Sequence, residues 1–185
     1  IEGRSMPGFK RANARRRYNG KNMACKTKDL EKLLDVYALL TSALDLKAVL
    51  TEVLNKAGAV LQAETSNIML LDAAAGELVY EVAQGEAGLR IMEQQRLKVG
   101  VGIAGWVAEN LKPLLVEDAY KDHRFFPGFD KKTGFRTKSV LCVPLFAKDR
   151  LIGVAEIINK KDGASFTTGD QALFTRYCVV AAIAI

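Results

Sequence analysis

Two stretches near the start of the chain space their apolar residues by three and four positions. They cover residues 30–44 and 46–61, and in each stretch the leucines and valines fall on one side of a helix. Asp45 lies between them and is suited to cap the second helix, because its carboxylate can accept hydrogen bonds from first-turn amides. The pattern therefore predicts two helices before any strand.

After residue 65 the spacing changes to alternation and to short apolar runs bounded by turn residues, which is typical of β-strands. The predicted strands are residues 66–72, 77–82, 96–99, 114–116, 139–146 and 151–158. The last two give the strongest signal, and a tight turn at residues 148–150 joins them. We expect this pair to be antiparallel and central.

A glycine cluster at residues 100–105 precedes a short predicted helix at 103–110. The cluster matches the pattern GxGxxG, but a dinucleotide-binding fold also needs a parallel βαβ unit and a longer helix before Pro113. The local physics still applies, because amides at a helix N-terminus attract anions and glycine lets a ligand approach the backbone. We expect that a phosphate could bind at this turn.

Residues 120–137 are polar, aromatic and rich in turn formers, which indicates a long loop or short helix covering a pocket. The final predicted helix begins at Thr168, which forms a capping-box pattern with Gln171 three residues later. We expect this helix to be cut short at residue 185.

The net charge of +6 is unevenly distributed along the 185 residues. Residues 1–28 contain 9 Lys and Arg against one acid, Glu2, whereas residues 29–185 contain 18 Lys and Arg against 20 Asp and Glu. We expect residues 1–28 to be an expression tag, with the protease-cleavage sequence IEGR, and a basic disordered arm. The remaining residues then form one domain of charge −2, which gives no support for a nucleic-acid partner.

Candidate catalytic and metal-binding residues are few. Cys25, Cys142 and Cys178 lack the paired spacing of a zinc site or disulfide framework, and His123 has no second histidine to share a metal or triad. We therefore expect no catalytic residues, no metal and no required cofactor. No apolar stretch approaches the ~20 residues of a membrane span, so we expect a cytoplasmic protein without a membrane partner.

One carboxylate lies in an unusual sequence environment. Glu156 sits in a predicted strand among small and apolar residues, where a buried charge without a partner would be costly. Two interpretations are open: a structural partner such as Lys138 or Arg136, or a ligand donor such as the edge of a purine.

Several short motifs occur together in a specific order. Four of the five residues of an NKFDE signature are present, with Gln171 where glutamate is usual; they are Asn159, Lys160, Phe166 and Asp170. The runs GIAG, GFRTK and GVAE stand at residues 102–105, 134–138 and 153–156. With these motifs, residues 129–185, and more loosely 33–116, resemble the GAF domains of cyclic-nucleotide phosphodiesterases and adenylyl cyclases.

The resemblance implies a fold and a site. The fold is α+β, an α/β sandwich in which long N- and C-terminal helices cover one face of a central antiparallel sheet. Short helices and a lid cover a ligand pocket on the other face. The implied ligand-binding residues are Asn67, Gln84, Ile103, Ala104, Asp130, Thr133, Thr137 and Glu156.

The resemblance also implies individual roles. The amides of Ile103 and Ala104 would face a phosphate, and Glu156 would meet the base. Lys160 and Asp170 would form an internal ion pair that ties a strand to the last helix. Two departures concern the base: Ala83-Gln84 stands where cyclic-GMP-binding members carry Phe-Asp, and Asn67 replaces serine. Gln84 would offer its amide to a purine edge.

Two functions follow from these expectations. The first is a regulatory domain that binds cyclic AMP or cyclic GMP, with lid closure passing a shift through the terminal helix to a covalently linked output domain outside this sequence. The alternative is a dimerisation and signal-relay module with no ligand or another small molecule. In either case we expect a homodimer through the helices at 30–44 and 168–185. A GAF enzyme or chromophore protein would need cysteine arrangements that the sequence lacks.

Overall fold

The structure, a computed structural model, describes residues 46–85 and 96–185. Its strands are β1 (Ala63–Asp72), β2 (Glu77–Gln84), β3 (Arg96–Lys98), β4 (Leu114–Val116), β5 (Val140–Ala147) and β6 (Arg150–Lys160). Its helices are α2 (Leu46–Val60), α4 (Gly102–Asn110), the 3-10 helix η1 (Ala119–Lys121), α5 (Gly128–Thr133) and α6 (Thr168–Ala184). The elements are those of an α+β fold, as the sequence predicts.

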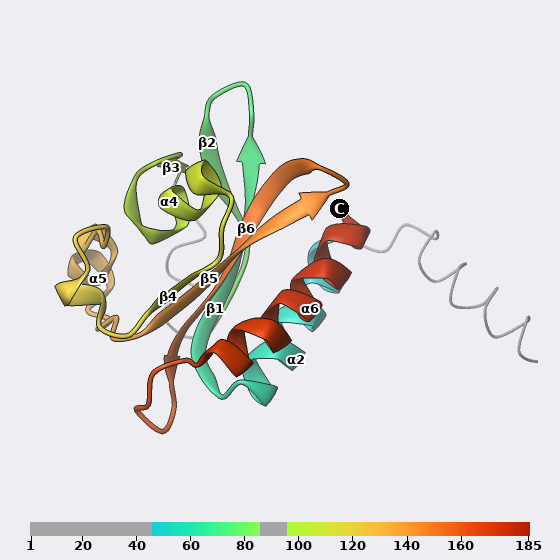
Figure 1. Cartoon of the computed structure of the whole chain (residues 1–185). Helices are drawn as coiled ribbons and strands as arrows, with labels where there is room; N and C mark the ends of the chain where they lie inside the picture. Colours follow the sequence, from blue (N-terminus) through green and yellow to red (C-terminus); the bar gives the residue numbers. More distant parts are fainter. Residues whose placement is uncertain (1–45, 86–95) are drawn as a thin grey trace, which may run out of the picture. The chain divides into compact units, whose positions relative to one another are not determined.

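All described strands join one antiparallel sheet in the order β3-β2-β1-β6-β5-β4 (Figure 1). The hairpins β1-β2 and β5-β6 lie next to each other, so that β1 and β6 form the centre. Their register pairs Asn67 with Glu156, although 89 residues separate them in the sequence. This central pairing positions the candidate site.

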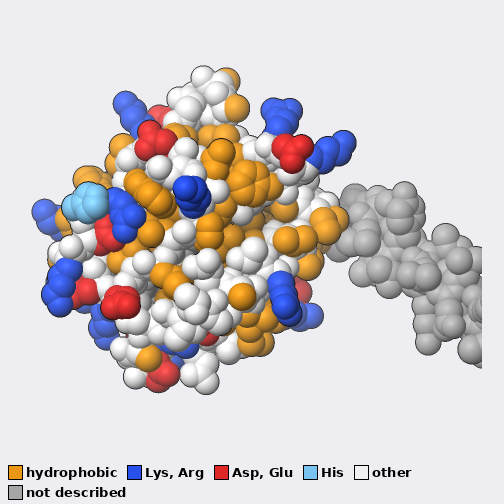
Figure 2. Space-filling view, in the orientation of Figure 1, with side chains coloured by type: hydrophobic (Ala, Val, Ile, Leu, Met, Phe, Trp, Pro, Cys, Tyr) orange, Lys and Arg blue, Asp and Glu red, His pale blue; other side chains and the backbone are white. Residues whose placement is uncertain are grey.

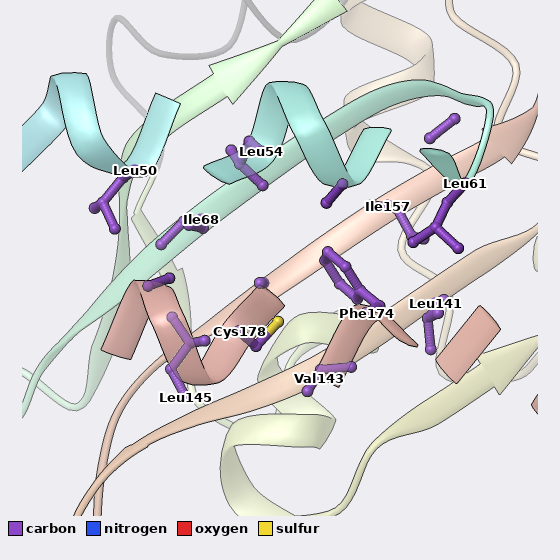
Figure 3. Packing of buried hydrophobic residues seen from close by; sticks show 14 of the residues in the cluster. Leu50, Leu54, Leu61, Ile68, Leu141, Val143, Leu145, Ile157, Phe174 and Cys178 are labelled. Atoms are coloured by element: carbon purple, nitrogen blue, oxygen red, sulfur yellow. The ribbon is translucent and has the colours of Figure 1, made fainter. Parts of the chain in front are cut away.

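Alternating residues of β5 face two different layers. Leu141, Val143 and Leu145 pack toward α2 and α6, whereas Val140 and Cys142 belong to the cluster around α4. Figure 3 shows Leu50 and Leu54 of α2 and Phe174 of α6 gathered over Ile68 and Ile157 of the sheet. The two long helices lie side by side on one face, as expected for this fold (Figure 1).

The other face of the sheet carries α4 and the segment with η1 and α5 (Figure 1). Helix α4 packs very closely on β3 at Gly105, where an added Cβ would lie 2.6 Å from the carbonyl oxygen of Lys98. A hydrogen atom is the only side chain that fits this contact without a shift. The contact at Gly105 therefore fixes α4 against this edge of the sheet. The short helices of residues 119–133 lie on the same face, as the lid interpretation predicts (Figure 1).

The start of α6 corrects one sequence-based expectation. Thr167, not Thr168, is the N-cap, and its hydroxyl accepts the amide of Asp170 while the Asp170 side chain accepts the amide of Thr167. The capping box thus uses Asp170 rather than Gln171 at the third helical position. Thr167 has the extended backbone that an N-cap needs, and both threonines give the same sequence signal.

Several expectations lie outside the described residues. They are the arm at 1–28, the helix at 30–44, the cap at Asp45 and most of the loop that follows β2. Among the described helices, none combines the length and the apolar character that a membrane span needs. Within the same residues no three His, Cys, Asp or Glu side chains cluster as a metal site would require.

Candidate functional site

A cavity of about 430 Å³ lies between the α4 face of the sheet and the segment 125–137. Its lining residues are Asn67, Tyr80, Arg96, Leu97, Gly102, Ile103, Ala104, Phe125, Phe126, Gly128, Phe129, Lys132, Thr137, Val140, Glu156 and Ile158. Asn67, Thr137 and Glu156 are buried, whereas Arg96, Phe126 and Lys132 are exposed. The cavity lining therefore combines buried polar side chains with exposed ones, two of which are basic.

Glu156 is held by its neighbours on the two adjacent strands. Asn67 of β1 donates from Nδ2 to Glu156 Oε2 at 3.2 Å, and Cys142 of β5 pairs with Glu156 across the sheet and hydrogen-bonds it through its thiol. Burial raises the pKa of Glu156 above its usual value, although both hydrogen bonds act in the opposite direction. The carboxyl is thus buried with neutral partners only.

Neither of the structural partners proposed for Glu156 pairs with it in the described residues. The guanidinium of Arg136 lies 3.6 Å from the ring centroid of Tyr120, and the backbone amide of Lys138 donates to Asn159 Oδ1 at 2.7 Å. In the described part of the chain, no ion pair includes Glu156. The interpretation in which Lys138 or Arg136 neutralises this carboxyl is therefore wrong.

Asn67 has an unused hydrogen-bond acceptor. Within residues 46–85 and 96–185, the buried side-chain oxygens without a partner are Asn67 Oδ1 and Ser139 Oγ. Asn67 lines the cavity and is 3% exposed. A buried polar atom without a partner costs free energy, so a bound donor at this position would be stabilising.

Asp130 has a different environment from the one expected. Its carboxylate accepts hydrogen bonds from the Tyr120 hydroxyl at 2.9 Å, the Thr137 amide at 2.8 Å and the Thr137 hydroxyl at 2.7 Å. It is 4% exposed and does not line the cavity. Asp130 thus lies within the lid segment, where it fixes Thr137, and does not face the cavity.

The N-terminus of α4 opens into the cavity. The N-cap residue, Val101, has no side chain that accepts the first amides, and Ile103 and Ala104 of the first turn line the wall. Gly102 has φ 70°, a conformation that glycine adopts at little cost. Amides at a helix start and the helix dipole attract an anion, and the lining cation Lys132 adds to this potential. Arg96 also lines the cavity, but its Nη1 is already paired with Asp72 at 2.8 Å and Glu77 at 3.3 Å.

Besides Asp130, two further expected ligand residues, Gln84 and Thr133, are not brought to the cavity. Gln84 pairs with Ser66, which faces Gly58 of α2, so both lie on the opposite face of the sheet. The cause is a β-bulge between Ile68 and Met69. It inserts Glu81 into β2, so that Gln84 no longer shares the face of Tyr80.

Thr133 lies at the end of α5, where its hydroxyl serves the local backbone. It donates to the carbonyl of Phe129 at 3.1 Å and accepts the amide of Phe135 at 3.2 Å. Thr133 is not among the lining residues. Its role here is to close the helix end.

The signature motif connects strand β6 with its surroundings. Asn159 is 1% exposed, and its side chain donates to the carbonyl of Arg136 at 2.9 Å and to Glu64 Oε2 at 2.8 Å. Lys160 Nζ lies 3.0 Å from Asp170 Oδ2 and 5.9 Å from the ring centroid of Phe166. The motif thus ties β6 to β1, to the end of the lid and to α6.

Most of the apolar residues that line the cavity were not predicted from the sequence. Ile158 follows Glu156 by two residues, so strand alternation would have placed it on the same face. Phe125, Phe126 and Phe129 belong to residues 120–137, which were predicted to cover a pocket, but their individual positions in the lining were not predicted. Tyr80 had no such signal, because the bulge that sets its orientation is not visible in the sequence. Burial, and then the nearby Glu156, raise the pKa of Tyr80, so its hydroxyl stays protonated.

Known proteins resemble this chain in sequence. The family model of the GAF domain matches residues 45–185. The chain is 32% identical over 173 residues to a probable 3',5'-cyclic phosphodiesterase, pde-5, of Caenorhabditis elegans, which covers 89% of this chain and 24% of that protein. It is 47% identical over 92 residues to the dual 3',5'-cyclic-AMP and -GMP phosphodiesterase 11 of Drosophila melanogaster, covering 46% of this chain and 6% of the relative. The chain thus spans a quarter or less of these relatives' length.

Solved structures resemble the fold. The GAF domain of a phosphoenolpyruvate-protein phosphotransferase from Coxiella burnetii superposes with a TM-score of 0.69 at 22% identity, covering 83% of this chain and 90% of that one. A free methionine-R-sulfoxide reductase from Neisseria meningitidis superposes with a TM-score of 0.63 at 18% identity, covering 80% and 81%. At such identities the likeness concerns the fold alone.

Proposed function

The chain belongs to the GAF family and is a regulatory domain, and from this premise we propose that its cavity binds a 3',5'-cyclic nucleotide, cyclic AMP or cyclic GMP. The relatives in Caenorhabditis elegans and Drosophila melanogaster are cyclic-nucleotide phosphodiesterases, and this chain matches a part of each. A domain that senses the same class of molecule fits such proteins.

One observation carries the proposal: a single cavity joins an open helix N-terminus to a buried carboxyl-amide pair. The phosphate of a cyclic nucleotide would meet the amides of Ile103 and Ala104, with Lys132 as the lining cation that has no carboxylate partner among the ion pairs of the described residues. The base would meet Asn67 and Glu156 at the buried end. The cavity volume of about 430 Å³ falls within the usual range of small-molecule sites, roughly 300–1,000 Å³.

The lid provides the remaining enclosure. Phe125, Phe126 and Phe129 line the cavity from this segment, and aromatic rings can cover the sugar or the base. A bound nucleotide would favour the closed lid, because only the closed state makes these contacts.

Contacts lead from the lid to the last helix. Asn159 holds the carbonyl of Arg136 at the end of the lid, and the next residue, Lys160, pairs with Asp170 in the first turn of α6. We propose that ligand binding passes through these contacts to α6 and to a covalently linked output domain. The relatives' much greater length leaves room for such a domain.

A second candidate function is dimerisation and signal relay, with an empty cavity or a different ligand. A specific observation favours a dimer: Val179, Val180 and Ile183 of α6 are 55%, 53% and 77% exposed. Apolar residues gathered on a helix surface are typical of an interface. The two functions are compatible, since a homodimer through α6 could carry the signal of either.

Isothermal titration calorimetry on ligand-depleted protein tests the proposal. Native mass spectrometry first establishes that the cavity is empty. We expect cyclic AMP or cyclic GMP to bind, and Glu156→Ala to weaken binding, since one hydrogen bond to a charged group contributes about 1.5–3 kcal/mol. Glu52→Ala is the control, because Glu52 lies on α2 across the sheet and pairs with Lys56 at 3.2 Å. Absence of heat with both nucleotides would reject the cyclic-nucleotide proposal.

A further inference from the structure

The lid segment, residues 118–137, makes its polar contacts within itself and with β5 and β6, but not with α4. Asp130, for example, accepts hydrogen bonds from Tyr120 and Thr137 of the same segment. Among the described residues, no hydrogen bond or ion pair joins this segment to α4. Its attachment to α4 therefore depends on side chains that pack on the helix.

Arg124 makes one such contact, to an aromatic ring. Its guanidinium carbon lies 4.8 Å from the ring centroid of Trp106 on α4. A cation within about 6 Å of an aromatic centroid is attracted by the negative face of the ring, most strongly for tryptophan. The Arg124 side chain is 22% exposed, so water screens this attraction less than it would on an open surface.

Asp122 fixes the orientation of the Arg124 guanidinium. Its Oδ1 accepts from Arg124 Nε at 2.8 Å and its Oδ2 accepts from Nη2 at 2.6 Å, which is a bidentate pair. Such a pair uses the edge of the planar guanidinium and leaves its faces free to approach a ring. Oδ1 also accepts the Arg124 amide at 2.9 Å, so the same carboxylate closes the turn.

A second contact lies on the same side of α4. Gly102 and Trp106 are four residues apart and are therefore neighbours on one helix face. A Cβ added at Gly102 would lie 3.7 Å from the Phe126 Cβ, an ordinary contact distance. Residues 124–126 thus follow the first turns of α4, and between the two contacts Phe125 lines the cavity.

We propose that Arg124 is a positioning residue: it fastens residues 122–126 to α4 through Trp106 and so keeps Phe125 and Phe126 at the cavity. We call Asp122, Arg124 and Trp106 the lid latch. In describing the cavity as the site of a nucleotide, the inference rests on the proposed function. Because both phenylalanines line the cavity beside α4, a weaker latch should let a bound molecule leave faster.

The latch can be tested first in the ligand-free protein. Trp106 is the only tryptophan of the 185 residues, so tryptophan fluorescence reports on this contact alone. In folded Arg124→Gln, acrylamide should quench Trp106 more strongly. Hydrogen exchange in residues 119–126 should be faster by about three- to tenfold, the effect of losing one cation–π contact on an opening equilibrium. Arg176→Gln, at an exposed position on α6, is the control. Unchanged quenching and exchange in Arg124→Gln would overturn the proposal.

A second background separates the latch from a local role of Arg124 in the turn at Asp122. In Trp106→Leu the ring is absent, so adding Arg124→Gln should change the exchange of residues 119–126 little further. An equal effect of Arg124→Gln in both backgrounds would show that Arg124 acts through Asp122 alone, and would refute the role of Trp106.

Nucleotide release tests the consequence for the site. Cyclic AMP or cyclic GMP, whichever binds, should dissociate from Arg124→Gln about threefold faster or more in stopped-flow displacement. Arg124→Lys keeps the charge without the planar fork and should lie between the variant and wild type. An unchanged release rate would refute the role in retaining the ligand. If neither nucleotide binds the ligand-depleted wild type, the proposed function fails, whereas fluorescence and exchange still decide whether the latch exists.

Discussion

Two buried carboxylates show how single residues divide the work of the site. Asp130 receives three hydrogen bonds from Tyr120 and Thr137, so its lone pairs are largely used by the chain itself. Glu156 receives bonds only from Asn67 and Cys142 and keeps unused acceptor capacity toward the cavity. The first residue therefore organises the lid, and the second is available to a ligand.

Glu156→Gln should stabilise the ligand-free domain at neutral pH. Burial raises the pKa of Glu156 in the folded state above its usual value of 4.5, so the protonated carboxyl favours folding. This stabilisation is fully present below pH 4.5 and is lost as pH rises through the higher pKa of the folded state. We expect the variant to gain about 1–3 kcal/mol in unfolding free energy over wild type at pH 8. Urea unfolding at pH 5 and pH 8 measures this, and an equal difference at both pH values would contradict it.

Asp130→Asn should loosen the lid without unfolding the sheet. The carboxylate accepts from two Thr137 groups, and an amide nitrogen facing either of them would place donor against donor. Hydrogen exchange in residues 119–137 should become faster by about tenfold or more, while peptides of α2 keep their rates. Asp162→Asn, at an exposed turn, is the control. Unchanged exchange in the lid would remove Asp130 from this role.

At the scale of elements, two close attachments define the structure around the site. Helix α4 contacts β3 through Gly105, where a Cβ has no room, and this contact holds the first turn of α4 at the cavity. Helix α6 begins in the capping box of Thr167 and Asp170 and is joined to β6 by the Lys160–Asp170 ion pair. The first attachment is a close backbone contact and the second is an ion pair, so neither depends mainly on the burial of apolar side chains.

A comparison of two helical glycines tests the first attachment. Alanine in place of glycine favours a helix by about 1 kcal/mol, so propensity alone predicts a gain at both Gly105 and Gly169. At Gly105 the new Cβ would lie 2.6 Å from the Lys98 carbonyl oxygen, whereas at Gly169 the nearest atom is 3.5 Å away. We expect Gly105→Ala to lower the unfolding free energy by about 1–3 kcal/mol and Gly169→Ala to leave it equal or higher. Equal gains in urea unfolding would show that α4 adjusts freely.

A double-mutant cycle tests the second attachment. Lys160→Met and Asp170→Asn should each destabilise, because the side chains are only 17% and 16% exposed and either charge alone would lack its partner. The coupling energy should be about 0.5–3 kcal/mol, and additive single effects would reject a direct pair.

The contribution of the Lys160–Asp170 ion pair to the unfolding free energy should depend on pH. Burial would raise the pKa of Asp170, but bonds from the Thr167 amide, Lys160 and the Thr167 hydroxyl outweigh it, and the pKa lies below its usual value. The stabilisation from the Asp170 carboxylate is therefore fully present above the usual aspartate pKa of 3.8. It is lost as pH falls through the lower pKa that Asp170 has in the folded state. Wild type and Asp170→Asn should converge in stability in that acidic range.

At the scale of the molecule, the sheet separates a supporting layer from a binding layer. Helices α2 and α6 cover one face, and the cavity with α4 and the lid occupies the other (Figure 1). In the face shown in Figure 2, hydrophobic side chains gather near the middle, with charges of both signs around them. This surface is not uniformly basic, which agrees with the charge of −2 counted for residues 29–185.

Ile183→Glu should prevent the proposed dimerisation. Ile183 is 77% exposed and lies beside Val179 and Val180 on α6, so a charge there would be buried without a partner in an α6 interface. Sedimentation velocity over a range of concentrations should show a dimer for wild type and a monomer for the variant. Leu111→Glu, at a 51% exposed residue after α4, should remain a dimer. A monomeric wild type at high concentration would contradict the proposal.

The sequence determined the elements and the family. The spacing of apolar residues changes from three and four positions to two, and this change distinguished the helices from the strands. It does so because the direction of each side chain is set by its position along a helix or strand. The predicted strands agree with β1 to β6 within a few residues at their ends. The ordered motifs led to the GAF family, and Ile103, Ala104, Thr137, Asn67 and Glu156 do line the cavity.

The tertiary structure alone decided which polar groups face the cavity and what they can still bind. Asn67 meets Glu156 through pairing across 89 residues, and one inserted residue in β2 moves Gln84 to the opposite face. The Thr137 hydroxyl is an acceptor only because its proton goes to Asp130. Such assignments depend on strand register and on the partners of each hydrogen, which are set by contacts between distant segments rather than by local sequence.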